Sequence, residues 1–181
     1  MHDTFALFGL VDEKSGRRID AARQRLSLKT GNDRALRFPP HVTIVGRVRA
    51  ERRRMKEVAE PLLLSLARLA AEPQELALGS PSFVPPDLLW LPVSSSSVLK
   101  GLHETAKDRL DQITEDLMDP SFQRTGYQPH ITLGWGVTSD ASEPLLDASL
   151  PRVTMVALAV ALYPETWENY GKVRVWRTAE L

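Results

Sequence analysis

Two seven-residue segments of the chain repeat one pattern in which a histidine and a threonine stand two positions apart. Each reads aromatic-x-Pro-His-x-Thr-aliphatic, with a β-branched residue between the histidine and the threonine, and they span residues 38–44 and 127–133. An imidazole exchanges protons near neutral pH, and a hydroxyl donates hydrogen bonds to anionic oxygens. The pattern therefore predicts a site in which acid–base groups lie beside phosphate-binding groups, twice over.

The alternation of side chains along a β-strand places these residues on one face. His41 and Thr43 project to the same side of an extended segment, and His130 and Thr132 do likewise, with aliphatic neighbours on the opposite side. The proline before each histidine restrains the residue ahead of it to extended backbone, which is typical of the start of a strand. If the two strands lie side by side, two imidazoles and two hydroxyls converge on a volume suited to a phosphate.

This set of side chains could hydrolyse a phosphodiester without a metal or a cofactor. One histidine would take a proton from the attacking water and the other would give a proton to the leaving oxygen, each contributing about 10²- to 10⁴-fold. The threonine hydroxyls would donate to the nonbridging oxygens, where charge grows in the transition state. The sequence contains no His-Glu-x-x-His, no acidic cluster with metal-ligand spacing and no glycine-rich phosphate loop. Of the other histidines, His2 is expected in a mobile N-terminus, and His103 is expected on the flank of a helical apolar stripe, at the boundary between the buried and exposed faces.

The composition limits the class of protein. The chain has 181 residues, of which 43% are hydrophobic, which is enough for one substantial core or two small lobes that share one. Lys plus Arg and Asp plus Glu both number 23, so no net field gathers polyanions, and a general nucleic-acid binder would be more basic. There are no cysteines, and the apolar run at 5–11 is too short to span a bilayer. We expect a cytoplasmic protein with no membrane segment and no obligate protein partner.

Hydrophobic periodicity predicts alternating strands and helices. A buried strand at 5–11 precedes a helix marked by Ile19, Ala22 and Leu26, and a helix at 51–71 contains Pro61, where a kink or break is expected. The other predicted elements are strands at 74–84 and 88–93 joined by a Pro85-Pro86-Asp87 turn, a helix at 97–113, a polar loop with Asp119-Pro120, a central strand at 152–163 and a strand at 173–176.

The separation of the motifs indicates an internal duplication. The two histidines stand 130 − 41 = 89 positions apart, close to half the chain, and each motif has a helix and several strands near it. No long Gly/Ser linker divides the two halves. We therefore expect one domain over residues 1–181, made of two pseudo-symmetric lobes that face each other across a cleft.

The paired Pro-His-x-Thr-aliphatic motifs resemble those of the 2H phosphoesterase superfamily, which includes bacterial 2′-5′ RNA ligase-like proteins and cyclic nucleotide phosphodiesterases. The run Phe-Pro-Pro-His-Val-Thr-Ile-Val-Gly at 38–46 is most similar to the cyclic phosphodiesterase branch. The resemblance implies a bilobal α+β fold of duplicated β-α-β-type modules, with curved antiparallel sheets facing a central groove. It also implies metal-independent opening of 2′,3′-cyclic or 1″,2″-cyclic phosphates, with His41 and His130 as the acid–base pair and Thr43 and Thr132 as phosphate donors.

Further residues are candidates for binding the substrate. Trp135 stands shortly after the second motif, where RNA ligase-like relatives often carry an arginine. It could stack on a base or pack in the core, and packing is the favoured role for a large aromatic in a strand. Arg47 shares strand parity with His41 and could reach a terminal phosphate, although the basic stretch at 47–56 is more typical of a solvated helix start. Four more aromatic residues are groove candidates for which ordinary packing is the favoured role: Phe8, Phe83, Trp90 and Tyr127.

These observations favour a metal-independent cyclic phosphodiesterase that acts on a small cyclic nucleotide or an RNA end. Two alternatives stay open. One is reversible 2′-5′ RNA ligation, in which a ribose hydroxyl replaces water, and the other is a noncatalytic module that binds a nucleotide or an RNA end. The balanced charge argues against long RNA, and the two intact motifs argue against a noncatalytic module. The sequence does not specify the nucleotide, the bond that breaks, which histidine is the base or the oligomeric state.

Overall fold

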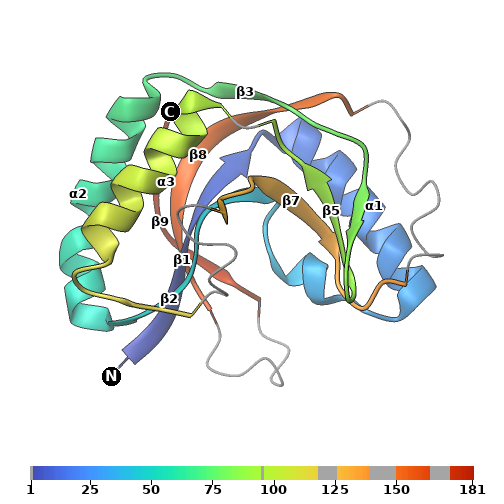
Figure 1. Cartoon of the computed structure of the whole chain (residues 1–181), viewed down its shortest axis with the longest axis horizontal. Coiled ribbons are helices and arrows are strands. Elements are labelled where there is room, and N and C mark those ends of the chain that lie inside the picture. Colours follow the sequence, from blue (N-terminus) through green and yellow to red (C-terminus); the bar gives the residue numbers. More distant parts are fainter. Residues whose placement is uncertain (1, 95, 118–125, 139–149, 164–171) are drawn as a thin grey trace.

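Two antiparallel sheets carry the two motifs, one motif in each sheet (Figure 1). The structure is a computed structural model, and it describes residues 2–94, 96–117, 126–138, 150–163 and 172–181. The larger sheet has the order β3-β8-β1-β2-β6, with β9 also paired to β8. Its strands are β1 (His2–Val11), β2 (His41–Glu51), β3 (Gln74–Ala77), β6 (Glu115–Asp116), β8 (Arg152–Leu162) and β9 (Arg174–Glu180).

The smaller sheet has the order β4-β5-β7 and presents the second motif. Its strands are β4 (Ser82–Val84), β5 (Leu88–Pro92) and β7 (His130–Gly134), and the first motif begins β2 of the larger sheet. The helices of the described chain are α1 (Glu13–Thr30), the 3-10 turn η1 (Arg34–Arg37), α2 (Arg52–Ala70) and α3 (Ser97–Leu110).

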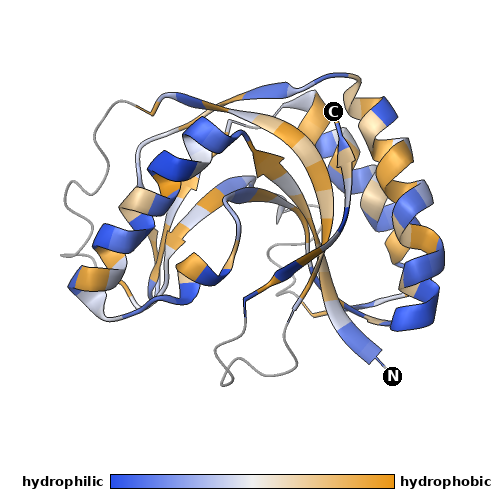
Figure 2. Cartoon of the chain, turned by 180° about the vertical axis from the view of Figure 1, so that it is seen from behind, coloured by the Kyte–Doolittle hydropathy of each residue, from blue (hydrophilic) through white to orange (hydrophobic). Residues whose placement is uncertain are grey.

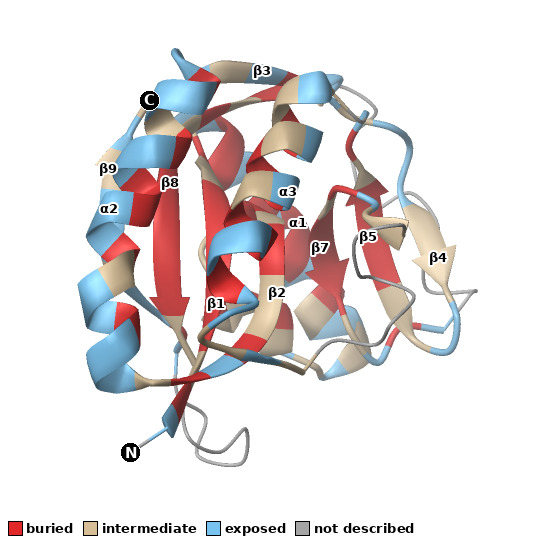
Figure 3. Ribbon diagram, turned by 60° about the vertical axis from the view of Figure 1, so that its left-hand side comes forward, coloured by how far each residue is buried: buried red, intermediate tan, exposed pale blue. Residues whose placement is uncertain are grey.

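The helices lie at the two ends of the molecule with the sheets between them. Helices α2 and α3 pack together beside the larger sheet, and α1 packs against β7 of the smaller one (Figure 1). Their apolar residues face the strands and their polar residues face outward (Figure 2). Strands β1, β2, β7 and β8 are accordingly mostly buried, whereas the outer sides of the helices are exposed (Figure 3). No helix in the described residues is long and apolar enough to cross a membrane.

Strand β1 separates two hydrophobic clusters by the alternation of its side chains. Phe5 and Leu7 belong to the main cluster, and Ala6 and Phe8 belong to a smaller cluster on the other face. Phe38, from the first motif, joins the smaller cluster together with Ala161 and Val173. The first motif therefore contributes Phe38 to the smaller cluster, whereas its aliphatic residues Val42 and Ile44 belong to the main one.

The predicted mixed α and β fold with antiparallel sheets is confirmed. The helix around Ile19 is α1, the hairpin at Pro85-Pro86-Asp87 joins β4 to β5, and the strand predicted at 152–163 is central, as β8 pairs with β1 on one edge and with β3 and β9 on the other. That the chain forms a single domain of two pseudo-symmetric lobes stays a prediction, and the loop with Asp119-Pro120 lies outside the described residues.

Three predictions differ from what the structure shows. The strand predicted at 74–84 is two strands in different sheets, because Gly79 and Pro81 interrupt it. Helix α2 continues through Pro61 without a break, since the buried side chains of Leu62, Leu63 and Leu66 hold the helix against the core. His2 lies in β1, paired with Glu51, and not in a mobile end.

Register shifts in β2 govern where Arg47 points. Between Phe8 and Phe5, β1 advances three residues, whereas β2 advances five, from Thr43 to Val48, so β2 holds two extra residues. One extra residue would move the following side chains to the opposite face, and a second extra residue restores the original parity. Arg47 consequently reaches the same side of the sheet as Thr43.

Candidate active site

One cavity of about 250 Å³ gathers the residues of both motifs. His41 and Thr43 line it from β2, and His130 and Thr132 line it from β7. All three further candidates also lie on its wall, namely Arg47, Tyr127 and Trp135. The structure thus brings together the four motif residues and these three candidates for substrate binding.

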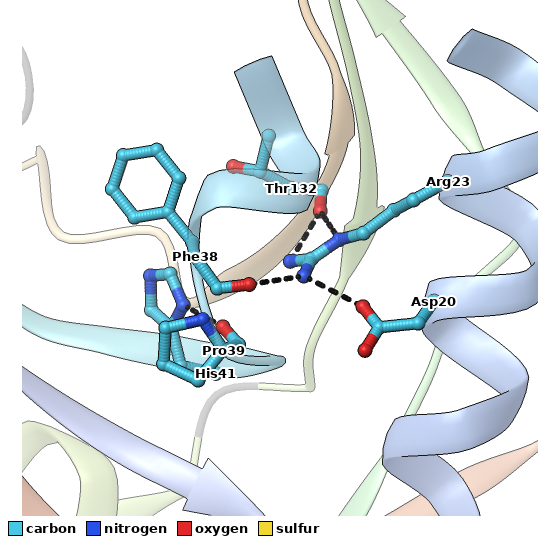
Figure 4. A network of polar contacts seen from close by, with 6 residues as sticks. All are labelled: Asp20, Arg23, Phe38, Pro39, His41 and Thr132. Atoms are coloured by element: carbon cyan, nitrogen blue, oxygen red, sulfur yellow. Dashed lines mark hydrogen bonds and ion pairs between the residues drawn. The ribbon is translucent and has the colours of Figure 1, made fainter. Parts of the chain in front are cut away.

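A buried arginine joins the two motif strands, which belong to different sheets (Figure 4). Arg23 of α1 is 1% exposed, and its Nε and Nη2 donate to the Thr132 carbonyl oxygen at 3.0 and 2.9 Å. Its Nη1 donates to the Phe38 carbonyl oxygen at 3.1 Å and to Asp20 Oδ1 at 3.2 Å. One planar guanidinium therefore binds the backbone of both motifs and fixes their relative position.

The approach of α1 to β7 depends on Gly134. A Cβ atom at this position would collide with the side chain of Leu26 in α1. The missing side chain lets the helix lie close on the strand, and this places Arg23 within reach of the Thr132 carbonyl.

A second cross-link runs from the second motif to the first. The Tyr127 hydroxyl donates to the Thr43 carbonyl oxygen at 3.1 Å, and its ring stacks on His103 with centroids 4.1 Å apart. Nδ1 of His103 lies 2.7 Å from the Ile44 carbonyl oxygen. Tyr127 and His103 thus hold β2 by two successive carbonyls, immediately beyond His41.

The prediction that His103 lies at the edge of the apolar stripe of its helix is wrong. It is 4% exposed and lines the cavity from α3. Its position three or four residues from Leu99 and Ala106 on the apolar stripe was the signal of burial. Arg23 gave the same kind of signal, a polar residue at helical spacing from Ile19 and Leu26 on a buried face.

The two motif histidines are held in the same tautomer. Nδ1 of His41 lies 2.7 Å from the Pro39 carbonyl oxygen, and Nδ1 of His130 lies 2.8 Å from the Gln128 carbonyl oxygen. A carbonyl oxygen only accepts, so Nδ1 must carry the proton and donate it. The neutral ring then has its lone pair on Nε2. In each motif, Nε2 is therefore the imidazole nitrogen that can accept a proton.

An aromatic ring supports each imidazole. Phe8 stacks on His41 with centroids 3.6 Å apart, and Trp90 lies 4.2 Å from His130. The described wall of the cavity includes neither of these rings, and it does not include Phe83. Phe8 and Trp90 are buried, as the sequence favoured, and Phe83 is half-buried in β4.

Burial and nearby positive charge disfavour the protonated form of His41. The pKa of His41 is lowered to about 3, mainly by desolvation in its buried position. The backbone hydrogen bond to Pro39 opposes this shift, and the charges of Arg23 and of a protonated His130 add to it. Burial also lowers the pKa of His130 below its ordinary value of 6.5. In the protein without a ligand, both rings are neutral at pH 7.

Most of the basic stretch after the first motif is neutralised on the outside of the molecule. Four of its arginines form ion pairs with acidic side chains, namely Arg49 with Glu115, Arg52 with Asp3, Arg53 with Glu57 and Arg54 with Glu51. Arg47 differs, because it lines the cavity and has no carboxylate partner among the described residues. Among the described residues there is also no cluster of three or more His, Asp or Glu that could hold a metal ion.

Comparisons with known proteins agree with the motifs and the fold. A family model of the 2′-5′ RNA ligase superfamily matches residues 11–167. Two solved structures of E. coli LigT, the apo form and the complex with 3′-AMP, align with a TM-score of 0.61 at 15% and 14% identity. These alignments cover 100% and 99% of this chain and 98% of LigT. A structure described as a phosphoesterase aligns with a TM-score of 0.53 at 14% identity, over 100% of this chain and 99% of that one. No curated protein sequence matches.

Fold and motifs together define a 2H phosphoesterase. The chain belongs to the 2′-5′ RNA ligase superfamily, since the family model covers most of its length. The structural neighbours are less than 25% identical, so they establish the fold alone.

Proposed function

We propose that the protein is a metal-independent phosphodiesterase of the cytoplasm that opens the cyclic phosphate of a small nucleotide or an RNA end, of the 2′,3′-cyclic or 1″,2″-cyclic kind. One observation carries this proposal. Two histidines with the same Nδ1 hydrogen bond, and hence the same free Nε2, line one cavity together with two threonines. An in-line displacement at phosphorus needs such a pair, one group on the side of the attacking water and one on the side of the leaving oxygen.

His41 is assigned the role of general base. It is the more deeply buried ring, and the positive charge of Arg23 disfavours its imidazolium, so its Nε2 lone pair is available at neutral pH. It takes a proton from water as the water oxygen forms a bond to phosphorus. The bond from phosphorus to one ribose oxygen breaks, and His130, protonated with the anionic substrate in place, donates its proton from Nε2 to that oxygen. The product is a phosphomonoester, and a proton passes from His41 to solvent and from solvent to His130 to restore the starting state.

The threonine hydroxyls are assigned to the nonbridging oxygens. Thr43 and Thr132 line the cavity beside the two histidines. Negative charge grows on the nonbridging oxygens in the transition state, and donors fixed on strands stabilise this charge without rearrangement. Neither threonine needs its side chain for the cross-links, because Tyr127 and Arg23 bind their backbone carbonyls.

Product analysis on a panel of cyclic phosphates in the presence of EDTA tests the proposal. We expect adenosine 2′,3′-cyclic phosphate or an equivalent 1″,2″-cyclic phosphate to be converted to a single monoester. The variants His41→Ala and His130→Ala should each be slower by about 10²- to 10⁴-fold. His2→Ala, an exposed histidine outside the cavity, is the control. Activity that disappears on chelation and returns with a divalent ion, or a motif variant with wild-type turnover, would overturn the mechanism.

A further inference from the structure

Two arginines share the cavity with the His–Thr quartet. Arg34 reaches it from η1, just ahead of the first motif, and Arg47 reaches it from β2, just after that motif. The guanidinium carbon of Arg34 lies 4.8 Å from the centroid of the Trp135 ring, which supports it from one side. The phenol of Tyr163 lies on the same part of the wall, and the charges of both arginines act on it.

The two guanidinium groups are close enough to repel each other. Burial lowers the pKa of Arg34, and the positive charge of Arg47 is the next largest cause of the lowering. Tyr163 and Asp87 act in the opposite direction with smaller effects. Burial raises the pKa of Tyr163 to about 12, so this phenol is neutral at pH 7. An anion between the arginines would remove the repulsion.

The position of these arginines suits a group other than the reacting phosphate. Arg47 stands four residues beyond Thr43 along β2, which is on the order of 10 Å even with the two extra residues of the bulged segment. The reacting phosphate is assigned to the His–Thr quartet, so Arg34 and Arg47, which line the same cavity, face an anionic group further along the ligand. The neighbouring arginines of the basic stretch offer no such site, because they are paired with carboxylates.

We propose that Arg34 and Arg47 form a subsite for a second phosphate of the substrate, separate from the cyclic phosphate held by the His–Thr quartet. This inference rests on the proposed function and narrows the substrate class to a nucleotide that bears a cyclic phosphate and one more phosphate. Two sources share this chemistry. One is a small nucleotide with a terminal phosphate, and the other is the internucleotide phosphate that precedes the cyclic end of an RNA.

Three matched substrates test the subsite. These are adenosine 2′,3′-cyclic phosphate, the same compound with a 5′-phosphate, and the dinucleotide ApA with a 2′,3′-cyclic phosphate. Each guanidinium that binds a phosphate is expected to contribute about 10- to 100-fold. We therefore expect kcat/KM for the 5′-phosphorylated compound to exceed that for the unphosphorylated one by at least tenfold.

In Arg34→Gln and Arg47→Gln the ratio of the two kcat/KM values should fall toward one, mainly through KM. The dinucleotide arm identifies the source, because a preference for it over the 5′-phosphorylated mononucleotide indicates an RNA end.

A control variant and a binding arm separate this inference from the proposed function. Arg49→Gln removes an exposed arginine of the same strand, outside the cavity, and should leave the ratio as in the wild type. Calorimetry compares adenosine 3′-phosphate with adenosine 3′,5′-bisphosphate, neither of which can be hydrolysed by ring opening. Tighter binding of the bisphosphate, lost in Arg34→Gln, supports the subsite even if no cyclic phosphate is hydrolysed. Hydrolysis with no preference for a second phosphate, or equal losses on all substrates in the arginine variants, would overturn the subsite and leave the proposed function intact.

Discussion

At the scale of single residues, the site is defined by the hydrogen bond from Nδ1 of each imidazole to a backbone carbonyl. His41 and His130 each bind the carbonyl oxygen two positions earlier, so a local turn of the chain fixes the tautomer in both motifs. The x-Pro-His pattern contains all the atoms of this contact. The motif therefore specifies ring orientation as well as residue type, and the repeat of the motif repeats the orientation.

The depressed pKa values predict an acidic pH optimum. Catalysis needs one neutral and one protonated histidine. The pKa of His41 is about 3 and burial lowers that of His130, so the required pair is populated only below the ordinary histidine pKa of 6.5. As the pH rises above about 6.5, kcat/KM should fall about tenfold per pH unit, because the acid loses its proton. A profile of kcat/KM for adenosine 2′,3′-cyclic phosphate between about pH 4.5 and 8.5 checks this. A rise between pH 7 and 8.5 would contradict the assignment of the histidines.

The threonine hydroxyls should affect turnover and not stability. Thr43→Val and Thr132→Val keep the shape of the side chain and the carbonyl that accepts the cross-link. If each hydroxyl acts as an oxyanion donor, its loss raises the activation barrier by about 2.7–4 kcal/mol. Thr→Ser at the same positions keeps the donor and is the matched control, which should retain most of the activity. Valine variants that remain active but melt at a different temperature would assign the threonines a structural role only.

At the scale of secondary structure elements, the sequence predicted each motif strand but not the contacts that fix the position of one strand relative to the other. Alternation and proline placement are local, so β2 and β7 could be predicted from segments of seven residues. Arg23 lies 109 positions from Thr132, and no local pattern reports that contact. The same reason explains the split of the strand predicted at 74–84, because its two halves pair with β8 and β5, which are distant from each other in sequence.

Removing the Arg23 guanidinium should disturb both stability and catalysis. Arg23→Met fills the buried space but leaves the Phe38 and Thr132 carbonyls without their donor, at about 1–3 kcal/mol for each carbonyl. Turnover should also fall, since the two motifs lose their shared support, while Arg17→Met on the exposed side of α1 should change the free energy of unfolding by less than about 1 kcal/mol. Chemical unfolding and kcat measured on the same samples check both effects. A destabilised Arg23→Met with wild-type kcat would restrict Arg23 to a purely structural role.

At the scale of the whole molecule, the distribution of charge decides which substrate the cavity serves. The net charge is zero, and the arginines at 49 and 52–54 are paired with acidic side chains, so the surface next to the site offers little attraction to a polyanion. Arg47, which belongs to the same basic stretch and has no carboxylate partner among the described residues, lines the cavity. A ligand with one or two phosphates matches that arrangement better than a long RNA.

The charge distribution predicts a weak dependence of activity on salt. A ligand that touches one or two phosphates releases few counterions, so the log of kcat/KM against the log of salt concentration should have a slope of about −1 to −2. A titration with a cyclic mononucleotide and with a 20-mer that ends in a 2′,3′-cyclic phosphate gives both slopes. The double variant Arg53→Gln/Arg54→Gln tests the outer basic stretch and spares Arg52, whose partner Asp3 is buried. A much steeper slope and a large preference for the 20-mer, both lost in the double variant, would show that this surface binds RNA and that the small-substrate assignment is wrong.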